Sequence, residues 1–308
     1  MRRLAWLLVL LGSSAAPVWG QPLSEPLRLR LTWENDLFAG QDRHYTNGLE
    51  VSLSGPLDLD CSPALLGGRR REWELALGQQ IYTPGDTSAP TPDPADRPYA
   101  GLAYLRLGVT RRDPTVEVRD RLELTLGFVG PASGAEAAQR RVHRLTGSSQ
   151  TQGWAHQLRQ EPAVALRYTV SPRLARGQAL GLDADLTADL ELALGNLSTH
   201  VRAGGLLRVG LRVPDEYSAV QPTPLRCYLT ASAHVRAVGY DLLLDGNLLR
   251  SGGPSARKQP LVLELSLGLT VAVSDRLTLS YTHTYRSPQF AGQRRGDQFG
   301  SVALTISW

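Results

Sequence analysis

The densest group of polar side chains lies in the segment 33–48, between two runs of alternating leucines. Glu34 and Asp36 supply carboxylates, and Thr46 supplies a hydroxyl and a carbonyl oxygen. Hard oxygen donors of this kind suit calcium far better than zinc. Because a divalent cation can polarise an ester carbonyl and stabilise the developing oxyanion, the segment is a candidate site for metal-assisted ester hydrolysis. Asp, Asn and Gly are also ordinary turn residues, so a plain turn is the alternative on spacing alone.

A histidine that can serve as a base lies in the connection 130–159. Histidine titrates near neutral pH and can therefore take a proton from water. His143 follows Gln139 by one helical turn, so the two side chains share a helix face. The sequence has no Gly-x-Ser-x-Gly elbow, which leaves a serine nucleophile without a local signature. The alternative for His143 is a solvated helix residue, and His44 carries no functional interpretation from its spacing.

The connection that contains His143 has the signature of a helix. Ser133 followed by Glu136 has the spacing of a capping box, and Gly147 is a typical left-handed terminator. An apolar stripe follows a neighbouring face of this helix: Ala138, Val142 and Leu145.

The elements that must position these residues are strands. In 182–194, leucine and alanine alternate with mostly acidic residues, a period of two that gives one oily and one acidic face. Twelve segments show such patterning: 27–35, 46–54, 71–82, 100–111, 115–129, 160–171, 180–196, 200–212, 227–241, 260–273, 276–288 and 298–308. Strands of soluble sandwiches have about five or six residues, whereas membrane barrels need about 9–11 per tilted strand. The lengths therefore predict an all-β fold, a twelve-stranded antiparallel transmembrane β-barrel with its leucines toward lipid.

Features at the two ends of the chain agree with an exported barrel. The sequence ends on Trp308 inside its last amphipathic segment, and the strand number is even. Two arginines precede the apolar run 4–11, and small residues follow up to Gly20, which predicts a secretory signal peptide over 1–20 and a barrel domain over 21–308. Beyond position 20, nothing approaches the about 20 apolar residues that a membrane helix needs.

The charge and the cysteines limit the classes of partner and scaffold. The net charge of +4 comes from scattered arginines, with Lys258 the sole lysine, so we expect no nucleic-acid partner. Cys61 and Cys227 are too few for a disulfide-built scaffold. Export would permit one bridge between them, and the sequence leaves both states open.

Counting strands gives the topology, because both termini of such barrels lie in the periplasm and the longer connections are external. The external connections are then 36–45, 83–99, 130–159, 197–199, 242–259 and 289–297. The helix can pack its stripe on the barrel wall and present His143 beside the segment 33–48, which closes a cleft at the level of the outer leaflet. The internal connection 213–226 is longer than expected and marks either a miscounted strand or an ordered periplasmic segment.

One local condition must hold for the first segment to work as a site. Strict alternation puts Asn35 and Asp36 on opposite faces of a strand, so both reach the cleft only if the strand ends or bulges there. The pair Ala39-Gly40 is compatible with such an end.

At these residues the sequence resembles the lipid A 3′-O-deacylase family of outer membranes, the LpxR-like proteins. The matching positions are Glu34-Asn35-Asp36, Asp42-Arg43-x-Tyr45-Thr46-x-Gly48, Ile81-Tyr82-x-Pro84, Asp96-Arg97-Pro98-Tyr99-Ala100-Gly101, Gly130-Pro131, Gln139-x-x-x-His143 and Gly153-Trp154-x-x-Gln157. They cover about residues 30–162, and the C-terminal half matches only as amphipathic strands.

The resemblance implies a carboxylic ester hydrolase with a helical extracellular loop, which removes the 3′-acyloxyacyl group of lipid A with calcium (Ca2+) as cofactor. Asn35, Asp36 and Thr46 fall on the positions of the calcium and oxyanion site, and His143 falls on the base that activates water. Ser149 departs from the pattern, because the family's enzymes have an acidic residue six positions after the histidine. The segment 83–95 also lacks the basic residues that some members carry.

Our expectation is a bacterial outer-membrane enzyme whose site faces the cell exterior and whose partner is lipid A within lipopolysaccharide. Glu34 joins Asp36 and Thr46 as an expected metal ligand, and three residues are expected to contact substrate: Arg97, Tyr99 and Gln139. The alternative from another class is a non-catalytic barrel, either a pore or a lipopolysaccharide-binding surface protein. A secreted soluble β protein is the third option.

Overall fold

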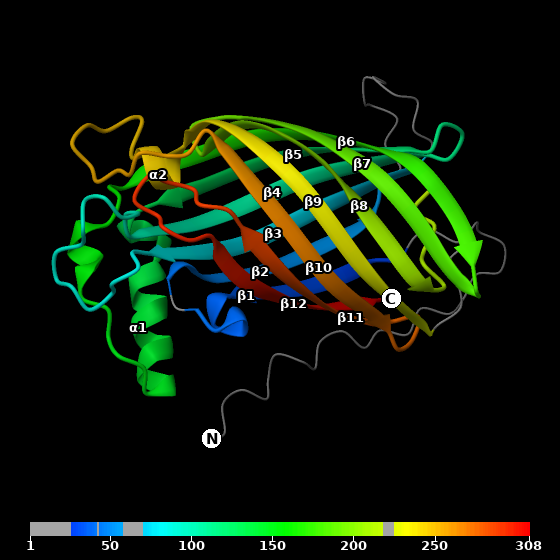
Figure 1. The fold of residues 1–308 in the computed structure, drawn as a ribbon, viewed down its shortest axis with the longest axis horizontal. Coiled ribbons are helices and arrows are strands. Elements are labelled where there is room, and N and C mark those ends of the chain that lie inside the picture. Colours follow the sequence, from blue (N-terminus) through cyan, green and yellow to red (C-terminus); the bar gives the residue numbers. More distant parts are fainter. Residues whose placement is uncertain (1–25, 42, 58–69, 218–224) are drawn as a thin grey trace.

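The computed structural model describes residues 26–41, 43–57, 70–217 and 225–308. The expected signal peptide, Asp42 and Cys61 lie outside these ranges. Within them, twelve antiparallel strands close into one barrel in which sequential strands pair and β1 pairs with β12 (Figure 1). The strands are β1 (Arg28–Asn35), β2 (His44–Pro56), β3 (Arg70–Thr83), β4 (Ala100–Asp113), β5 (Val118–Val129), β6 (Glu161–Ala179), β7 (Leu182–Leu194), β8 (Ser198–Leu211), β9 (Arg226–Asp241), β10 (Leu261–Ala272), β11 (Leu277–Arg286) and β12 (Asp297–Ser307). The predicted twelve-stranded antiparallel barrel is confirmed.

Short helices lie in the connections at one end of the barrel, here called the helix end (Figure 1). They are η1 (Asp36–Ala39), η2 (Pro131–Ser133), α1 (Ala135–Thr146), η3 (Gly153–His156) and α2 (Leu242–Asp245). At the opposite, terminal end, where β1 begins and β12 ends, Leu27 and Trp308 exchange backbone hydrogen bonds of 3.1 and 3.0 Å. No helix in the described ranges has the length and apolar character needed to cross a membrane.

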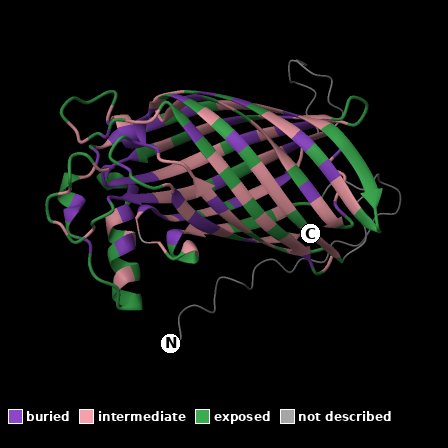
Figure 2. Cartoon of the chain, in the orientation of Figure 1, coloured by how far each residue is buried: buried purple, intermediate pink, exposed green. Residues whose placement is uncertain are grey.

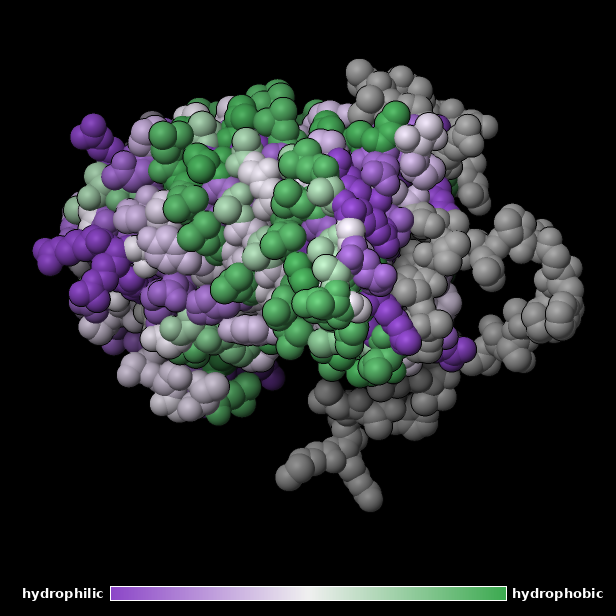
Figure 3. Space-filling model, turned by 45° about the vertical axis from the view of Figure 1, so that its right-hand side comes forward, coloured by the Kyte–Doolittle hydropathy of each residue, from purple (hydrophilic) through white to green (hydrophobic). Residues whose placement is uncertain are grey.

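The alternation of side chains along β7 shows how the sequence builds the wall. Leu186 and Leu190 are 38% and 57% exposed on the outer face, whereas Asp185 and Glu191 are only 3% and 7% exposed on the lumen face. Figure 3 shows hydrophobic side chains across the middle of the wall and hydrophilic ones toward both ends. An apolar band between polar margins is typical of a barrel wall in contact with lipid.

Apolar side chains narrow the lumen at the helix end. Inward-facing residues of the strands, among them Tyr45, Tyr82 and Phe299, form one buried cluster with Leu158 and Leu242 from the connections. Figure 2 shows buried residues concentrated at this end. This cluster packs the strands β2 to β6 and β12 against the connections at the helix end.

At the terminal end, one strand is longer than predicted and one connection is ordered where it begins. β6 continues past the predicted end at 171 to a tight turn at Leu180 and Gly181, whose φ angles are 55° and 76°. The connection 213–226, which is longer than expected for this end, begins as an ordered segment: Tyr217 is 2% exposed and its hydroxyl donates to the carbonyl of Ser171 at 3.0 Å. This connection is not a missed strand, because β8 and β9 pair directly.

Candidate functional site

Asn35 and Asp36 lie where the first strand ends and a short helix begins. Asn35 is the last residue of β1, and its Oδ1 caps η1 by accepting the backbone N–H of Leu37 at 2.8 Å. Asp36 then turns away from the strand and is only 1% exposed; its Oδ2 accepts the backbone N–H of Arg43 at 2.6 Å. Gly40 ends η1 with a φ of 68°, a left-handed conformation that favours glycine. The condition that the strand must end between Asn35 and Asp36 is met.

A bulge in β2 lies beside the end of β1 and contains Thr46. The β2–β3 register shifts between Tyr45 and Asn47, and the hydroxyl of Thr46 lies 2.8 Å from that of Thr83. Asn47 pairs with Asn35 across the β1–β2 ladder, and its Oδ1 accepts the Nδ2 of Asn35 at 3.3 Å. Both asparagines share the outer face of the wall with the exposed Trp33, whose indole N–H donates to Asn47 at 2.8 Å. The bulge thus gathers oxygen donors on the outer face.

Glu34 does not join this group. It lies on the lumen face, where the hydroxyl of Tyr45 donates a short hydrogen bond to its carboxylate. A side chain at Gly48 would collide with that hydroxyl, so glycine is required beside the pair. Among the described residues, no cluster of three or more His, Cys, Asp or Glu side chains forms a metal site. The oxygen donors near the end of β1 are therefore one carboxylate, the hydroxyls of Thr46 and Thr83, and the amides.

Helix α1 is seated on the outer face of β3 and β4, but it does not begin as the capping-box spacing predicted. Its N-cap is Gly134, with a φ of 69° and no side-chain cap, whereas Ser133 belongs to η2 and donates its hydroxyl to the Gly130 carbonyl at 2.6 Å. Gln79 of β3 holds the same turn by donating to the Ser133 carbonyl at 2.7 Å. The capping-box prediction was wrong because the hydroxyl closes the preceding turn. The terminator prediction is confirmed, with Gly147 at a φ of 74°.

Only the first turns of α1 pack on the wall. Ala135 and Gln139 are buried, whereas Val142 and Leu145 are 54% and 78% exposed. The prediction that the stripe packs on the wall was wrong for these two residues, because α1 projects away from the barrel beyond its first turns (Figure 1). Close approach at its start requires Gly101 in β4, where a Cβ would collide with the side chains of η2 and α1.

Gln139 and Tyr99, both expected to contact substrate, lie in the packing under α1. The Oε1 of Gln139 accepts the indole N–H of Trp154 at 2.8 Å, which fixes the orientation of the amide. Its Nε2 is buried and has no hydrogen-bond partner among the described residues. Tyr99 is fully buried with its ring 4.9 Å from that of Trp154. These residues attach the connection before β6 to the wall, and Gln139 retains one unused donor.

His143 lies one turn further along α1 and is half-buried. Its Nδ1 lies 2.6 Å from the carbonyl oxygen of Ser149. Because a carbonyl oxygen only accepts hydrogen bonds, Nδ1 is the donor and the proton of the neutral ring resides there. Nε2 is therefore the nitrogen with a free lone pair.

Arg97 lies elsewhere, on the lumen side of the rim. It is 1% exposed, its guanidinium stacks 4.5 Å above the Tyr82 ring, and its Nη1 donates to Gln289 at 3.4 Å. The structure therefore does not bring Arg97 to the outer-face group that contains Asn35 and Thr46.

The structure also shows a group of hydrogen-bonded side chains at the rim of the barrel that residue spacing did not predict. His44, at a φ of 65°, lies between two carboxylates, with Nδ1 2.7 Å from Asp297 and Nε2 3.2 Å from Asp96. Burial alone would raise the pKa of Asp96, but hydrogen bonds from His44 and from the backbone amides of Gly85 and Arg97 outweigh it and hold the pKa below its ordinary value. His44 and Asp297 are 253 positions apart, and no local sequence signal connects them.

Comparisons with known proteins agree with this architecture. The chain matches the family model of outer membrane protein LpxR over residues 4–308. Among solved structures it is similar to LpxR from Salmonella typhimurium, with a TM-score of 0.76 and 19% identity over 91% of this chain and 100% of that one. The beta domain of the Bordetella autotransporter Brka gives a TM-score of 0.45 at 12% identity, covering 92% of this chain and 99% of that one. The comparison with curated proteins returned no match. The match over nearly the whole chain shows that this protein belongs to the LpxR family of outer membrane proteins.

Proposed function

We propose that this barrel is a calcium-dependent lipid A deacylase that hydrolyses the ester of the 3′-acyloxyacyl group in the outer leaflet. The observation that carries the proposal is the hydrogen bond between His143 and the carbonyl oxygen of Ser149, on a helix seated against the outer face of the wall. Membership of the LpxR family supports the same class of reaction.

The hydrogen bond of His143 holds the ring in a tautomer whose Nε2 can act as a general base. With the proton on Nδ1, Nε2 takes a proton from water as the water oxygen attacks the ester carbonyl. The imidazolium can then return that proton to the leaving alkoxide oxygen. The Ser149 carbonyl orients the ring, so an acidic side chain at this position is not required for orientation.

The group at the end of β1 fits a hard cation. Asp36 offers a buried carboxylate, Thr46 a hydroxyl and Asn47 an amide oxygen, and all of these are oxygen donors of the kind that calcium prefers. Calcium, when bound, polarises the ester carbonyl and stabilises the oxyanion. Asn35 has a positioning role, because its cap on η1 sets the direction in which Asp36 leaves the strand. With Glu34 on the lumen face, the charge count is low, which predicts weak calcium affinity.

The surroundings of this group suit a substrate that lies in a membrane. Apolar side chains on η1 and α1 are exposed, with Leu37 at 64% and Leu145 at 78%. We therefore assign the helix end to the cell exterior, which brings the site to the outer leaflet and to lipopolysaccharide.

The non-catalytic alternative divides into two forms. An open pore is disfavoured by the buried apolar cluster around Tyr45, Tyr82 and Phe299, which narrows the lumen at the helix end. A surface protein that binds lipopolysaccharide without hydrolysing it would use the same outer face, so only an assay of the reaction separates it from the enzyme.

The proposal is tested with purified protein in detergent micelles that contain lipid A. We expect fatty acid release by the wild type, loss of release on chelation, and recovery when calcium is returned. Asp36→Asn should need more calcium than the wild type for half-maximal release, since it removes a ligand charge. Release that is indifferent to chelator would contradict the calcium site, and binding of lipid A without release would favour the surface protein.

A further inference from the structure

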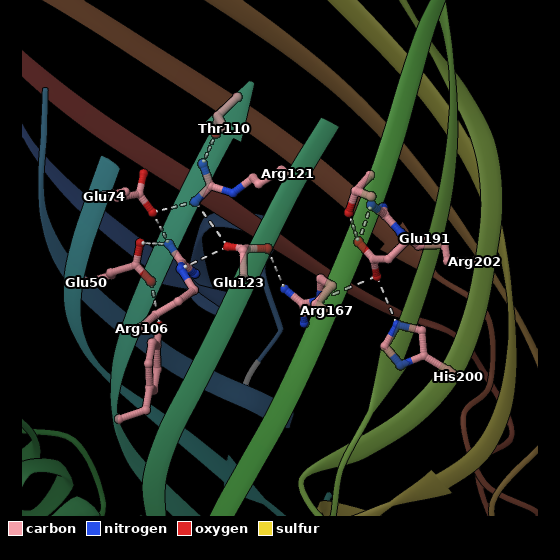
Figure 4. A network of polar contacts seen from close by, with 12 residues as sticks. Glu50, Glu74, Arg106, Thr110, Arg121, Glu123, Arg167, Glu191, His200 and Arg202 are labelled. Carbon is pink, nitrogen blue, oxygen red and sulfur yellow. Dashed lines mark hydrogen bonds and ion pairs between the residues drawn. The ribbon is translucent and has the colours of Figure 1, made fainter. Parts of the chain in front are cut away.

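A polar cavity of about 230 Å³ lies inside the barrel, where it is lined by the strands β6 to β11. It is lined by two histidines, a valine and six charged residues: Arg167, Glu191, Arg202, Arg236, Glu264 and Arg286. Arg286 ends β11 and Arg202 lies near the start of β8, so the cavity lies in the half of the lumen nearest the helix end. Figure 4 shows part of its lining, with Arg167 and Arg202 directed at Glu191.

The first carboxylate of the cavity is shared among two arginines and a histidine, and it also accepts the hydroxyl of Thr169 at 3.2 Å. Glu191 is 3.1 Å from Arg202, 3.5 Å from Arg167 and 2.9 Å from the Nε2 of His200. A single negative charge distributed over three groups leaves each of them incompletely compensated. Arg167 has one further ion pair of similar length, 3.4 Å to Glu123.

The second carboxylate is already bound by one arginine. The Oε2 of Glu264 accepts both the Nε and an Nη of Arg286, at 2.9 and 2.7 Å. Four guanidinium groups thus line the cavity with only two carboxylates, and both carboxylates already have arginine partners. The lining has an excess of positive charge.

Arg236 is the fourth arginine of the cavity lining. Among the described residues it has no hydrogen bond and no ion pair, although it lines the cavity. In the register of β8 and β9 it stands directly opposite Arg202, and on its other side β10 presents the apolar Val262. Like charges opposite one another on neighbouring strands repel. Burying a guanidinium inside a barrel without a hydrogen bond or ion pair also costs free energy. The cavity therefore lacks a negative charge that would compensate Arg236.

We propose that this cavity binds a small oxyanion, of the phosphate or carboxylate class, between Arg236, Arg202 and Arg286. The planar fork of arginine matches the oxygen spacing of both groups. The volume holds several times the about 30 Å³ that a water molecule occupies in the liquid. It stays below the about 300 Å³ at which pockets for drug-sized ligands begin. The ligand is therefore a free small anion rather than a glycolipid headgroup, and it stabilises the barrel by joining β8, β9 and β11.

The test uses the full barrel in detergent, with inorganic phosphate titrated against chloride at constant ionic strength. A ligand that binds only the folded state raises Tm with concentration, so we expect Tm of the wild type to rise with phosphate. Arg236→Gln should lose this rise, and its Tm without phosphate should equal or exceed that of the wild type, because repulsion with Arg202 is relieved. Arg257→Gln is the matched control, since it removes the same charge from an exposed position outside the cavity.

Two outcomes would overturn the proposal. One is an equal phosphate-dependent rise of Tm in Arg236→Gln and in the wild type. The other is the absence of a saturable, single-site heat when phosphate is added to the wild type in a calorimeter. The second measurement needs no variant, so it decides the matter even if Arg236→Gln fails to fold. Parallel titrations with acetate distinguish a carboxylate site from a phosphate site.

Discussion

The imidazole Nδ1 of His143 donates a hydrogen bond to the backbone carbonyl of Ser149, six positions later, at 2.6 Å. The helix cap makes this contact possible, because Gly147 turns the chain back and its N–H bonds to the carbonyl of His143 itself. The residue that departs from the family pattern thus orients the candidate base through its backbone.

The first prediction concerns the side chain of Ser149. Since the carbonyl rather than the hydroxyl makes the contact, Ser149→Ala should retain fatty acid release within about twofold of the wild type, well short of the 10²-fold loss that removal of a general base causes. Steady-state release from lipid A in micelles measures this. A loss as large as that of His143→Ala would mean that the Ser149 side chain is part of the mechanism.

The second prediction concerns the contact between β4 and the start of α1. Gly101→Val places a side chain where η2 and α1 approach β4, and overpacking of this kind costs about 1–3 kcal/mol. We expect a folded barrel with a displaced helix and little activity. Gly177→Ala is the control, because no atom lies within 4 Å of its added Cβ. Folding is read from the gel mobility of unheated samples. Full activity of Gly101→Val would show that the contact between β4 and α1 is not needed for hydrolysis.

The sequence was most informative where a repeated pattern decides the structure. Alternation such as that around Leu186 and Asp185 gives the wall, because a one-residue slip would place every acidic side chain in lipid. The break between Asn35 and Asp36 was predictable for the same reason.

Contacts between distant or competing partners could not be predicted in this way. The Ser133 hydroxyl has two possible uses, a helix cap or a turn, and only the approach of Gln79 to its carbonyl shows which is realised. The hydrogen bond between His44 and Asp297 depends on the closure of the barrel, which places β2 and the start of β12 at one rim.

The third prediction is a pH dependence at that rim. The pKa of Asp96 lies below its ordinary value of 3.8, so its contribution to stability is fully present above pH 3.8 and is lost as the pH falls through the lowered pKa of the folded state. Asp96→Asn should therefore lower Tm at neutral pH, and the difference from the wild type should shrink in acid. Thermal unfolding across this range checks the sign, and a difference that stays constant would contradict it.

The fourth prediction concerns the exposed end of α1. Leu145 is 78% exposed and follows the basic Arg144, a pattern that suits a helix resting at a membrane interface. Leu145→Asp should reduce hydrolysis of lipid A in bilayers while leaving hydrolysis in detergent micelles near the wild-type rate. Val116→Asp is the control, because Val116 is an apolar residue that is 61% exposed at the terminal end. Equal losses in micelles and bilayers would instead indicate damage to the site.

The most direct test of the whole account is the lipid A of living cells. Mass spectrometry of lipid A from cells that express the wild type should show loss of the acyl groups at the 3′ position. His143→Ala should reduce this loss by at least about 10²-fold, and His156→Ala, a histidine of the same connection outside the site, should not change it. Deacylated lipid A from cells that make only the folded His143→Ala barrel would contradict the account.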